Sequence, residues 1–277
     1  PTGAGWYDAN TYAPISTDEY VPIVPGSSRY RFNGWTTARM AEITNPSALS
    51  TTVLMDEAKT VTANYIVQYQ ITFAQTGVDP DFTGPVVNID SIGYGVGSLP
   101  VSFWWDVNSV HNFDFKSPLV VTANVKRYVW VSTSGLSTVR SGSITVSVSG
   151  SITGHYKTQY YLTVQPTPPG ITTIPGEGWY DALVPPFDVS LTAPYVAGYE
   201  FIYWDVDGVS QGSGVSSITV PMNAPHVATA HYKSLAAPVG GYSVSLATPA
   251  GTTPLVGYAM ILALFSAVLT LIRRKRK

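Results

Sequence analysis

The five residues Val61-Thr62-Ala63-Asn64-Tyr65 decide the fold, because they occur three times in related form. The other two copies are Ile152-Thr153-Gly154-His155-Tyr156 and Ala228-Thr229-Ala230-His231-Tyr232. In each copy the first, third and fifth residues are apolar or small, whereas the second and fourth are polar. Successive side chains of a β-strand point to opposite faces. The pattern therefore predicts a half-buried strand of an antiparallel sheet, which we call the closing strand.

Three stretches from the first 67 residues recur in the same order near the end of the chain, at offsets that drift from 173 to 167. Ordered matches with small changes in spacing indicate two copies of one module whose loops differ in length. The matched pairs are Gly5-Trp6-Tyr7-Asp8-Ala9 with Gly178-Trp179-Tyr180-Asp181-Ala182, Tyr30-x-Phe32-x-x-Trp35 with Tyr199-x-Phe201-x-x-Trp204, and Met55 to Tyr65 with Met222 to Tyr232.

A second strand pattern follows the first two closing strands, as Gln68-Tyr69-Gln70-Ile71-Thr72-Phe73 and Gln159-Tyr160-Tyr161-Leu162-Thr163-Val164. We call it the opening strand. It places three modules at residues 1–67, 68–158 and 159–233. The first module has no counterpart of the opening strand, and the chain begins at Pro1, so we expect a module that is truncated at its N-terminus.

Two local patterns refine the strand prediction. Phe32 and Trp35 are three residues apart, which breaks the period of two. A β-bulge at Gly34 would restore both aromatic side chains to the core, because a bulge inserts one residue. In Ser143 to Ser149 the alternation is regular, and it predicts a strand with Ile144, Val146 and Val148 on one face.

The combination of G-W-Y-D-A, Y-x-F-x-x-W and the closing strand resembles the divergent internalin-type B-repeat of bacterial and archaeal surface proteins. The resemblance covers the first and third modules, and the third departs from it at Pro225-His226-Val227. The middle module shares only the strand at each end, and its interior is similar to β-sandwich or Ig-like spacers. The resemblance implies a mainly β fold of tandem small β-grasp-like or β-sandwich modules in a linear array, with no catalytic residues.

The C-terminal region predicts a membrane anchor. Leu255 to Ile272 contains 18 residues without a charge, and as a helix it would span about 27 Å of a ~30 Å hydrocarbon core. Tyr258 would lie near one interface, and the basic residues Arg273, Arg274, Lys275, Arg276 and Lys277 at the other. The positive-inside rule then gives a single-pass plasma-membrane protein with a cytoplasmic tail at 273–277 and an extracellular N-terminal region.

Two further expectations concern this end of the chain. Residues 234–254, rich in Ala, Pro, Gly, Ser and Thr, are expected to be a flexible linker. An apolar segment before a basic cluster also resembles tails that sortase-like transpeptidases remove. Leu246 to Gly251 does not match the LPxTG-type motif, so we expect the anchor to be retained.

Composition narrows the function. The chain has 277 residues, of which 12% are charged. It contains no cysteine, and this excludes disulfides and thiolate sites. Without the five basic residues at the C-terminus the formal net charge falls from −2 to −7, which argues against nucleic acid as a partner. Expected partners are the lipid bilayer and, as candidates, glycans or other surface proteins.

Few residues suggest chemistry. No Ser-His-Asp, HExxH or phosphate-loop motif appears, so we expect no enzyme activity and no cofactor. Asp205 and Asp207 resemble the start of a calcium loop, but the rest of that pattern is missing and a hairpin turn at Asp207-Gly208 is the preferred interpretation. Adjacent Trp104 and Trp105 are candidates for glycan contact, although they should point to opposite faces of a strand.

The leading hypothesis is a non-enzymatic, membrane-anchored stalk or spacer that displays a more N-terminal region outside the cell. One alternative is an adhesin or a subunit that assembles into a surface layer or filament. A second alternative is the C-terminal part of a secreted, anchored hydrolase. Bacterial and archaeal envelopes both remain open as the location.

Overall fold

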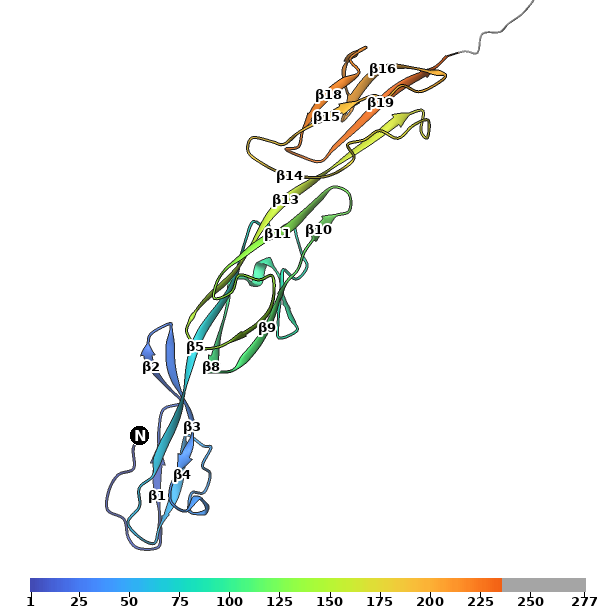
Figure 1. Cartoon of the computed structure of the whole chain (residues 1–277). Coiled ribbons are helices and arrows are strands. Elements are labelled where there is room, and N and C mark those ends of the chain that lie inside the picture. Colours follow the sequence, from blue (N-terminus) through green and yellow to red (C-terminus); the bar gives the residue numbers. More distant parts are fainter. Residues whose placement is uncertain (236–277) are drawn as a thin grey trace, which may run out of the picture. The chain divides into compact units, whose positions relative to one another are not determined.

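The computed structural model of this chain describes residues 1–235, whose regular structure is β-strand apart from two 3₁₀ turns, with no α-helix (Figure 1). The 3₁₀ turns are η1 (Met40–Glu42) and η2 (Val96–Ser98). The strands are β1 (Thr11–Ser16), β2 (Tyr20–Val24), β3 (Ser28–Thr36), β4 (Ser50–Met55), β5 (Thr62–Thr76), β6 (Val87–Ile89), β7 (Ile92–Tyr94), β8 (Val101–Asp106), β9 (Val110–Phe115), β10 (Leu119–Thr122), β11 (Lys126–Gly135), β12 (Ser141–Thr145), β13 (Gly150–Thr167), β14 (Gly178–Asp181), β15 (Asp188–Thr192), β16 (Tyr199–Val206), β17 (Val209–Ser213), β18 (Ser217–Pro221) and β19 (His226–Ser234).

Three separate hydrophobic cores lie between pairs of sheets. In the first sandwich the β1-β4 pair packs on β3 and the first half of β5. In the second, the β12-β9-β6-β7 sheet packs on β8, β11 and parts of β5 and β13. In the third, the β15-β18 pair packs on β16, β19 and the second half of β13. The fold is thus mainly β and sandwich-like, while the module boundaries given above stay a prediction.

Adjacent sandwiches share a strand. β5 pairs with β3 through residues 62–69 and with β8 through 68–73, so one continuous strand closes the first sandwich and opens the second. β13 does the same for the second and third, because it pairs with β11 through residues 152–160 and with β14 through 159–162. Figure 1 shows both strands passing from one group of strands into the next. The predicted closing and opening strands are therefore halves of single strands.

Parallel pairing joins these long strands to each other. Residues 71–76 of β5 pair with 150–155 of β13, and residues 162–167 of β13 pair with 226–231 of β19. Together these pairings combine β5, β13 and β19 into one eleven-stranded sheet that contributes to all three sandwiches.

The predicted bulge at Gly34 is confirmed. The register of β3 against β5 shifts between Phe32 and Gly34, Gly34 has a φ of 113°, and Trp35 is 2% exposed. The same shift occurs between Phe201 and Tyr203 of β16, and it brings Trp204 fully into the third core. In both copies the buried indole donates its N–H to a backbone carbonyl, that of Ala48 or Ser216.

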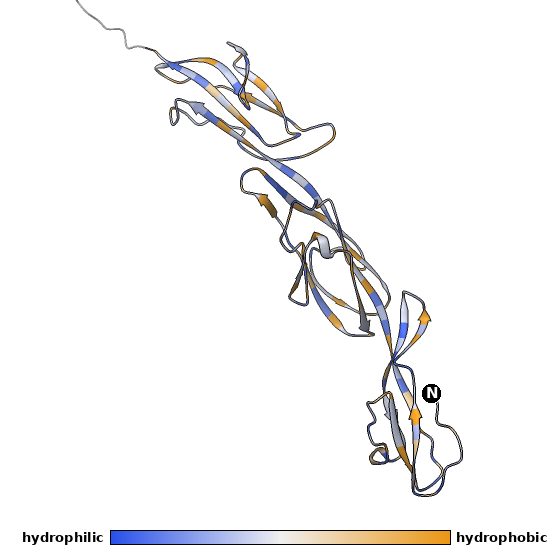
Figure 2. Cartoon of the chain, turned by 180° about the vertical axis from the view of Figure 1, so that it is seen from behind, coloured by the Kyte–Doolittle hydropathy of each residue, from blue (hydrophilic) through white to orange (hydrophobic). Residues whose placement is uncertain are grey.

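The alternation of the closing strand is also confirmed, and Figure 2 shows polar and apolar residues alternating along the strands. Ile152 and Tyr156 of the second copy are buried, as are Ala228, Ala230 and Tyr232 of the third. Gly154 is a glycine because a Cβ there would lie 2.6 Å from Cδ1 of the buried Phe115. A small residue at this position therefore lets the facing sheet approach.

Three expectations need correction. The middle module shares more than its end strands, since β11 carries a bulge between Trp130 and Ser132 at the position equivalent to the bulges of β3 and β16. Residues 1–235 contain no α-helix, so the sandwich rather than the helix-bearing β-grasp describes the modules. β12 ends at Thr145, and Val148 is half exposed instead of sharing the inward face of Ile144 and Val146.

The predicted linker, anchor and tail at 234–254, 255–272 and 273–277 lie outside the described residues, apart from Ser234 and Leu235. Within residues 1–235, no helix has the length and apolar character that crossing a membrane requires.

We predict that Gly154→Ala destabilises the second sandwich by about 1–3 kcal/mol, because the new methyl group overlaps the Phe115 ring. The control is Gly142→Ala on β12, where the nearest atom to a new Cβ is 3.4 Å away and little change is expected. Denaturant unfolding of the full chain in detergent, monitored by hydrogen exchange across β9 and β13, measures both. Adding Phe115→Leu should restore part of the loss; equal stability of the two alanine variants would contradict the packing argument.

Candidate functional site

The most organised polar site in the described residues is the place where β3 and β8 flank β5. Gln68 of β5 is only 6% exposed, and its amide links the two flanking strands. Its Oε1 accepts a hydrogen bond of 2.8 Å from Nε of Arg29, and its Nε2 donates one of 2.8 Å to Oδ1 of Asp106. Arg31 completes the group with a bidentate contact to Asp106, at 2.6 and 3.2 Å. We call this group the first junction cluster.

Aromatic rings cover the arginine of the same cluster. Cζ of Arg29 lies 3.6 Å from the ring centroid of Tyr20 and 4.4 Å from that of Trp104. Such cation–π contacts, together with the hydrogen bond to Gln68, fix the guanidinium between two strands that belong to different sandwiches.

A second junction cluster repeats this arrangement where β11 and β14 flank β13. Nε of Arg127 donates to Oε1 of Gln159 at 2.8 Å, and Nε2 of Gln159 donates to Oδ1 of Asp181 at 2.7 Å. Arg127 also lies over Trp179, with Cζ 4.3 Å from the ring centroid. Lys157 takes the place of Arg31 and contacts Asp181 at 2.7 Å. The chain therefore builds the same Arg–Gln–Asp bridge and the same Arg–Trp contact at both junctions.

The carboxylates of both clusters are held in the charged form. The hydrogen bond from Arg31 lowers the pKa of Asp106, and the bond from Gln68 adds to this against the opposing effect of burial. At Asp181 burial would raise the pKa, but the hydrogen bonds from Lys157 and Gln159 outweigh it and the pKa is lowered. Both groups thus stabilise the fold above the ordinary carboxyl pKa of about 3.9, and this contribution is lost as the pH falls through their folded values.

The candidate glycan residues Trp104 and Trp105 point to opposite faces of β8, as expected. Trp104 contacts Arg29, whereas Trp105 packs against the second core. The Trp105 ring is stacked on His111, with centroids 3.6 Å apart, and on Phe103 at 5.1 Å. Protein groups already occupy these rings, and glycan contact at this place stays a prediction.

Asp205 and Asp207 form a hairpin turn between β16 and β17. Oδ1 of Asp205 accepts a hydrogen bond from the N–H of Gly208, and both Asp207 and Gly208 have positive φ. The hairpin interpretation is confirmed. The carboxylate of Asp207 contacts Nδ1 of His226 and the N–H of Val227, so the two aspartates do not converge on one point. Within residues 1–235, no group of three His, Asp or Glu side chains could hold a metal ion.

One constellation was missed by the sequence analysis. Nδ1 of His111 lies 2.7 Å from Oδ2 of Asp90, and its Nε2 lies 3.0 Å from Oγ of Ser109, which is the order of a hydrolase triad. The Ser109 hydroxyl, however, donates to the carbonyl of Asp106 at 2.6 Å, and its own N–H bonds to that carbonyl as well. Neither the hydroxyl proton nor this N–H is directed toward a substrate.

The same Asp–His pair occurs where no nucleophile is present. Asp90 and Asp207 both have positive φ, and the carboxylate of each accepts a hydrogen bond from Nδ1 of a histidine. Each also accepts one from the backbone N–H of the residue after that histidine, Asn112 or Val227. At His226 the third group is Asn223 instead of a serine. We therefore interpret Asp90–His111 as a clamp that ties a turn to a neighbouring strand. The repeat-position histidines are also engaged: His155 bonds Thr76 and Ser134, and His231 stacks on Tyr203.

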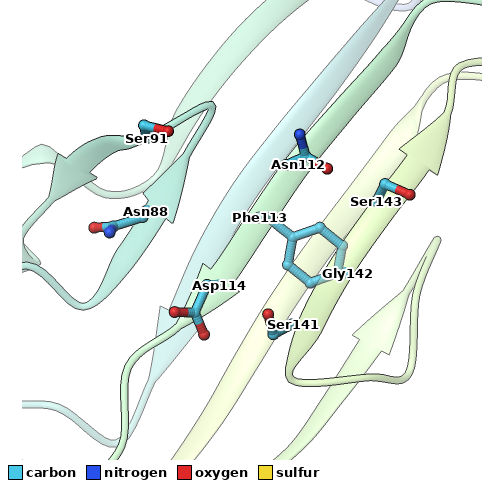
Figure 3. A pocket seen from close by; sticks show the side chains of 8 residues that line it. All are labelled: Asn88, Ser91, Asn112, Phe113, Asp114, Ser141, Gly142 and Ser143. Carbon is cyan, nitrogen blue, oxygen red and sulfur yellow. The ribbon is translucent and has the colours of Figure 1, made fainter.

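A shallow polar depression of about 440 Å³ lies on the outer face of the β12-β9-β6 sheet (Figure 3). Its acidic group, Asp114, is ion-paired with Lys116 at 2.6 Å. The serines and asparagines in it can exchange hydrogen bonds with a polar ligand, and the one carboxylate among the lining residues is already paired with a lysine. The lining residues are Asn88, Ser91, Asn112, Phe113, Asp114, Ser141, Gly142 and Ser143.

Two segments of the chain, residues 23–68 and 160–236, match the divergent InlB B-repeat domain. This confirms the B-repeat resemblance for residues 23–67 of the first module and for the third module, and it leaves 1–22 and 69–159 outside the match. The matched segments stop and start beside Gln68 and Gln159, the residues at the centre of the junction clusters. No curated protein and no solved structure matches the chain.

Two recurrences in the sequence mark the junction residues, and neither was used in the predictions above. Arg29-Tyr30 recurs as Arg127-Tyr128, and Trp104-Trp105-Asp106 belongs with the two Trp-Tyr-Asp motifs already noted. What the sequence could not give is that an arginine, a glutamine and an aspartate from three strands meet. That depends on the register of β5 with its two neighbours. The predicted anchor residues 255–277 lie outside the described residues.

We predict that Gln68→Leu destabilises the chain by about 1–3 kcal/mol, because Arg29 and Asp106 then lose a hydrogen-bond partner in a mostly buried place. The matched control is Gln70→Leu on the same strand, since within residues 1–235 Gln70 forms hydrogen bonds through its backbone and none through its side chain. Denaturant unfolding of the full chain in detergent gives both values. A loss at Gln70 as large as that at Gln68 would contradict the bridging role.

Proposed function

We propose that this chain is a non-enzymatic stalk or spacer of a cell surface, anchored in the plasma membrane, which holds a more N-terminal region away from the cell. The observation that carries the proposal is the sharing of β5 and β13 between adjacent sandwiches. Most multidomain chains have exposed linkers where few contacts cross a boundary. Here the boundary is the middle of a strand that is hydrogen-bonded on both sides.

Such a boundary resists bending. At residues 68–69 β5 is paired with β3 on one side and with β8 on the other, so a hinge there would break ladder hydrogen bonds. It would also separate the groups of the junction cluster, some of which are buried. The second junction has the same construction through residues 159–160 of β13. A spacer needs stiffness of this kind, whereas an enzyme would need a site that neither the junctions nor the polar depression supplies.

The membrane part of the proposal rests on sequence. Leu255 to Ile272 would form the single transmembrane helix, with residues 273–277 in the cytoplasm and 234–254 as a tether outside the bilayer. The match to a B-repeat domain supports a surface-associated repeat protein. Lipid is then the expected partner of one end, and other surface proteins or glycans are candidates for the rest.

The stiffness of the first junction can be measured by electron–electron resonance, because the chain has no cysteine that would take up a spin label. In a Thr62→Cys, Thr76→Cys variant of the full chain, one strand that rises ~3.3 Å per residue predicts a narrow distribution near about 46 Å. Four residues of Gly-Ser inserted after Val67 should broaden it. A broad distribution in the chain without the insertion would refute a stiff junction.

Membrane attachment is tested by flotation with phosphatidylcholine and phosphatidylglycerol vesicles. We expect the full chain to float with the vesicles and a chain that ends at Ser234 to stay in the dense fraction. Leu264→Arg should weaken retention, since an arginine at the centre of a transmembrane helix costs about 2.5–3.5 kcal/mol. Failure of the full chain to float would leave a stalk without this anchor.

A further inference from the structure

The first sandwich lacks a strand that the other two possess. In the second sandwich residues 71–76 of β5 pair with 150–155 of β13, and in the third residues 162–167 of β13 pair with 226–231 of β19. In both pairs the second segment begins two residues before a closing strand and includes the first four residues of that strand. The equivalent segment of the first sandwich is 59–64, and within the described residues that edge has no strand beside it on the side away from β3.

A groove opens above the first core at the same place. It has a volume of about 440 Å³, and Trp35, Val53, Met55 and Val61 contribute to its walls. In the other sandwiches the corresponding space is filled by the opening strand, whose inward side chains Ile71, Phe73 and Leu162 are completely buried. The groove is therefore where two apolar side chains of a further strand would lie.

The other wall of the groove is preformed for such a strand. Gly178 to Asp181 forms β14, which pairs antiparallel with the opening strand at 159–162. Its counterpart, Gly5-Trp6-Tyr7-Asp8, keeps the local geometry: the Tyr7 hydroxyl donates to the carbonyl of Gly3 at 2.9 Å, as that of Tyr180 does to Gly176 at 2.8 Å. Gly3 and Gly176 also have similar φ values, 110° and 116°.

The polar half of a junction is present there without its complement. Trp6 is fully exposed, whereas its counterpart Trp179 contacts Arg127. Asp8 is exposed and forms no salt bridge within residues 1–235, whereas Asp181 contacts Gln159 and Lys157. The missing groups are the glutamine that an opening strand supplies at the two complete junctions and the arginine of the strand beside it.

We propose that this groove is the acceptor for a β-strand of the repeat's own pattern, Gln-Tyr-x-(Leu or Ile)-Thr-(Val or Phe), which continues the closing strand of a preceding module of the same type. The strand lies parallel to residues 59–64 and antiparallel to 5–8. Its glutamine reaches Asp8, its two apolar residues fill the groove, and an arginine of the neighbouring strand covers Trp6. The inference extends the stalk proposed above by one module, but it does not depend on membrane attachment.

A second copy of this chain does not supply that strand from its described residues, because its opening strands are buried in its own cores. Residues 241–246 read Gly-Tyr-Ser-Val-Ser-Leu and share the apolar alternation. They carry glycine where both opening strands have the glutamine that bonds aspartate, and so they lack the donor for Asp8. This segment serves as the competing occupant in the test.

The test uses the full chain in detergent with a copy of residues 158–173 placed directly before Pro1, since the offset of 173 makes Ile174 the counterpart of Pro1. We expect hydrogen exchange at residues 59–64 to slow by about tenfold or more, as these amides join a ladder. The emission of Trp6, assigned with Trp6→Phe, should shift, because Tyr161 of the added copy then lies beside Trp6 as it lies beside Trp179, with ring centroids 5.1 Å apart. The control carries Leu162→Asp and Val164→Asp in the added copy only and should leave both signals unchanged.

A measurement in trans keeps the proposal testable if the fusion misfolds. A synthetic peptide of residues 158–167 should slow exchange at 59–64 of the unmodified chain, and a peptide of residues 240–249 should not. No slowing by either the fusion or the first peptide would overturn the proposal. Stronger slowing by the second peptide, with concentration-dependent association in sedimentation, would overturn it in favour of a second copy. The spin-label distance across β5 is independent of all these outcomes, so the stalk and the acceptor groove can fail separately.

Discussion

In β5 and β13 one backbone has to satisfy two sandwiches at once. The first half of each strand takes its partners from one pair of sheets, and the second half takes them from the next. One half of the strand cannot move without displacing the other, because the residues between them are hydrogen-bonded to neighbouring strands on both sides. A flexible linker between two sandwiches would let each unfold alone. A shared strand instead makes the stability of one sandwich depend on that of the next. The stability of a repeat protein is approximately the sum of the stabilities of its repeats and of the interfaces between neighbouring repeats. Here each of those interfaces contains a strand that both neighbours share.

This constraint explains why hydrogen-bonded polar and charged side chains form the junctions, whereas apolar side chains form the cores. Where β3 gives way to β13 along one edge of β5, the face opposite the cores has no second sheet to cover it. Gln68 lies on that face and is still almost fully buried, because Arg29, Arg31 and Asp106 surround it. A shift of the register by two residues would separate the glutamine from both partners and leave polar atoms without hydrogen bonds. The cluster thus favours one alignment of three strands.

The sequence predicted the local structure well wherever one strand carried the information. The closing strand, the bulge at Gly34 and the Asp207-Gly208 turn each follow from a few adjacent residues. The continuity of β5 was missed although the sequence held a sign of it. Tyr65, Tyr69, Ile71 and Phe73 all have odd numbers and point the same way, as one uninterrupted strand requires. The division into a closing strand and an opening strand separated two stretches along which the alternation of side chains continues without interruption.

The contacts between distant strands could not be read in this way. Ser109, His111 and Asp90 meet because a turn at Asp90 folds against β9, and no pattern of spacing distinguishes that clamp from a catalytic triad. The second clamp at Asp207 and His226 does distinguish them, since a repeat conserves geometry within one chain. The same internal comparison gives the array a direction. In each complete core the opening strand continues the closing strand of the sandwich before it, so one strand belongs to two successive cores, and the groove of the first sandwich lies where such a strand would enter.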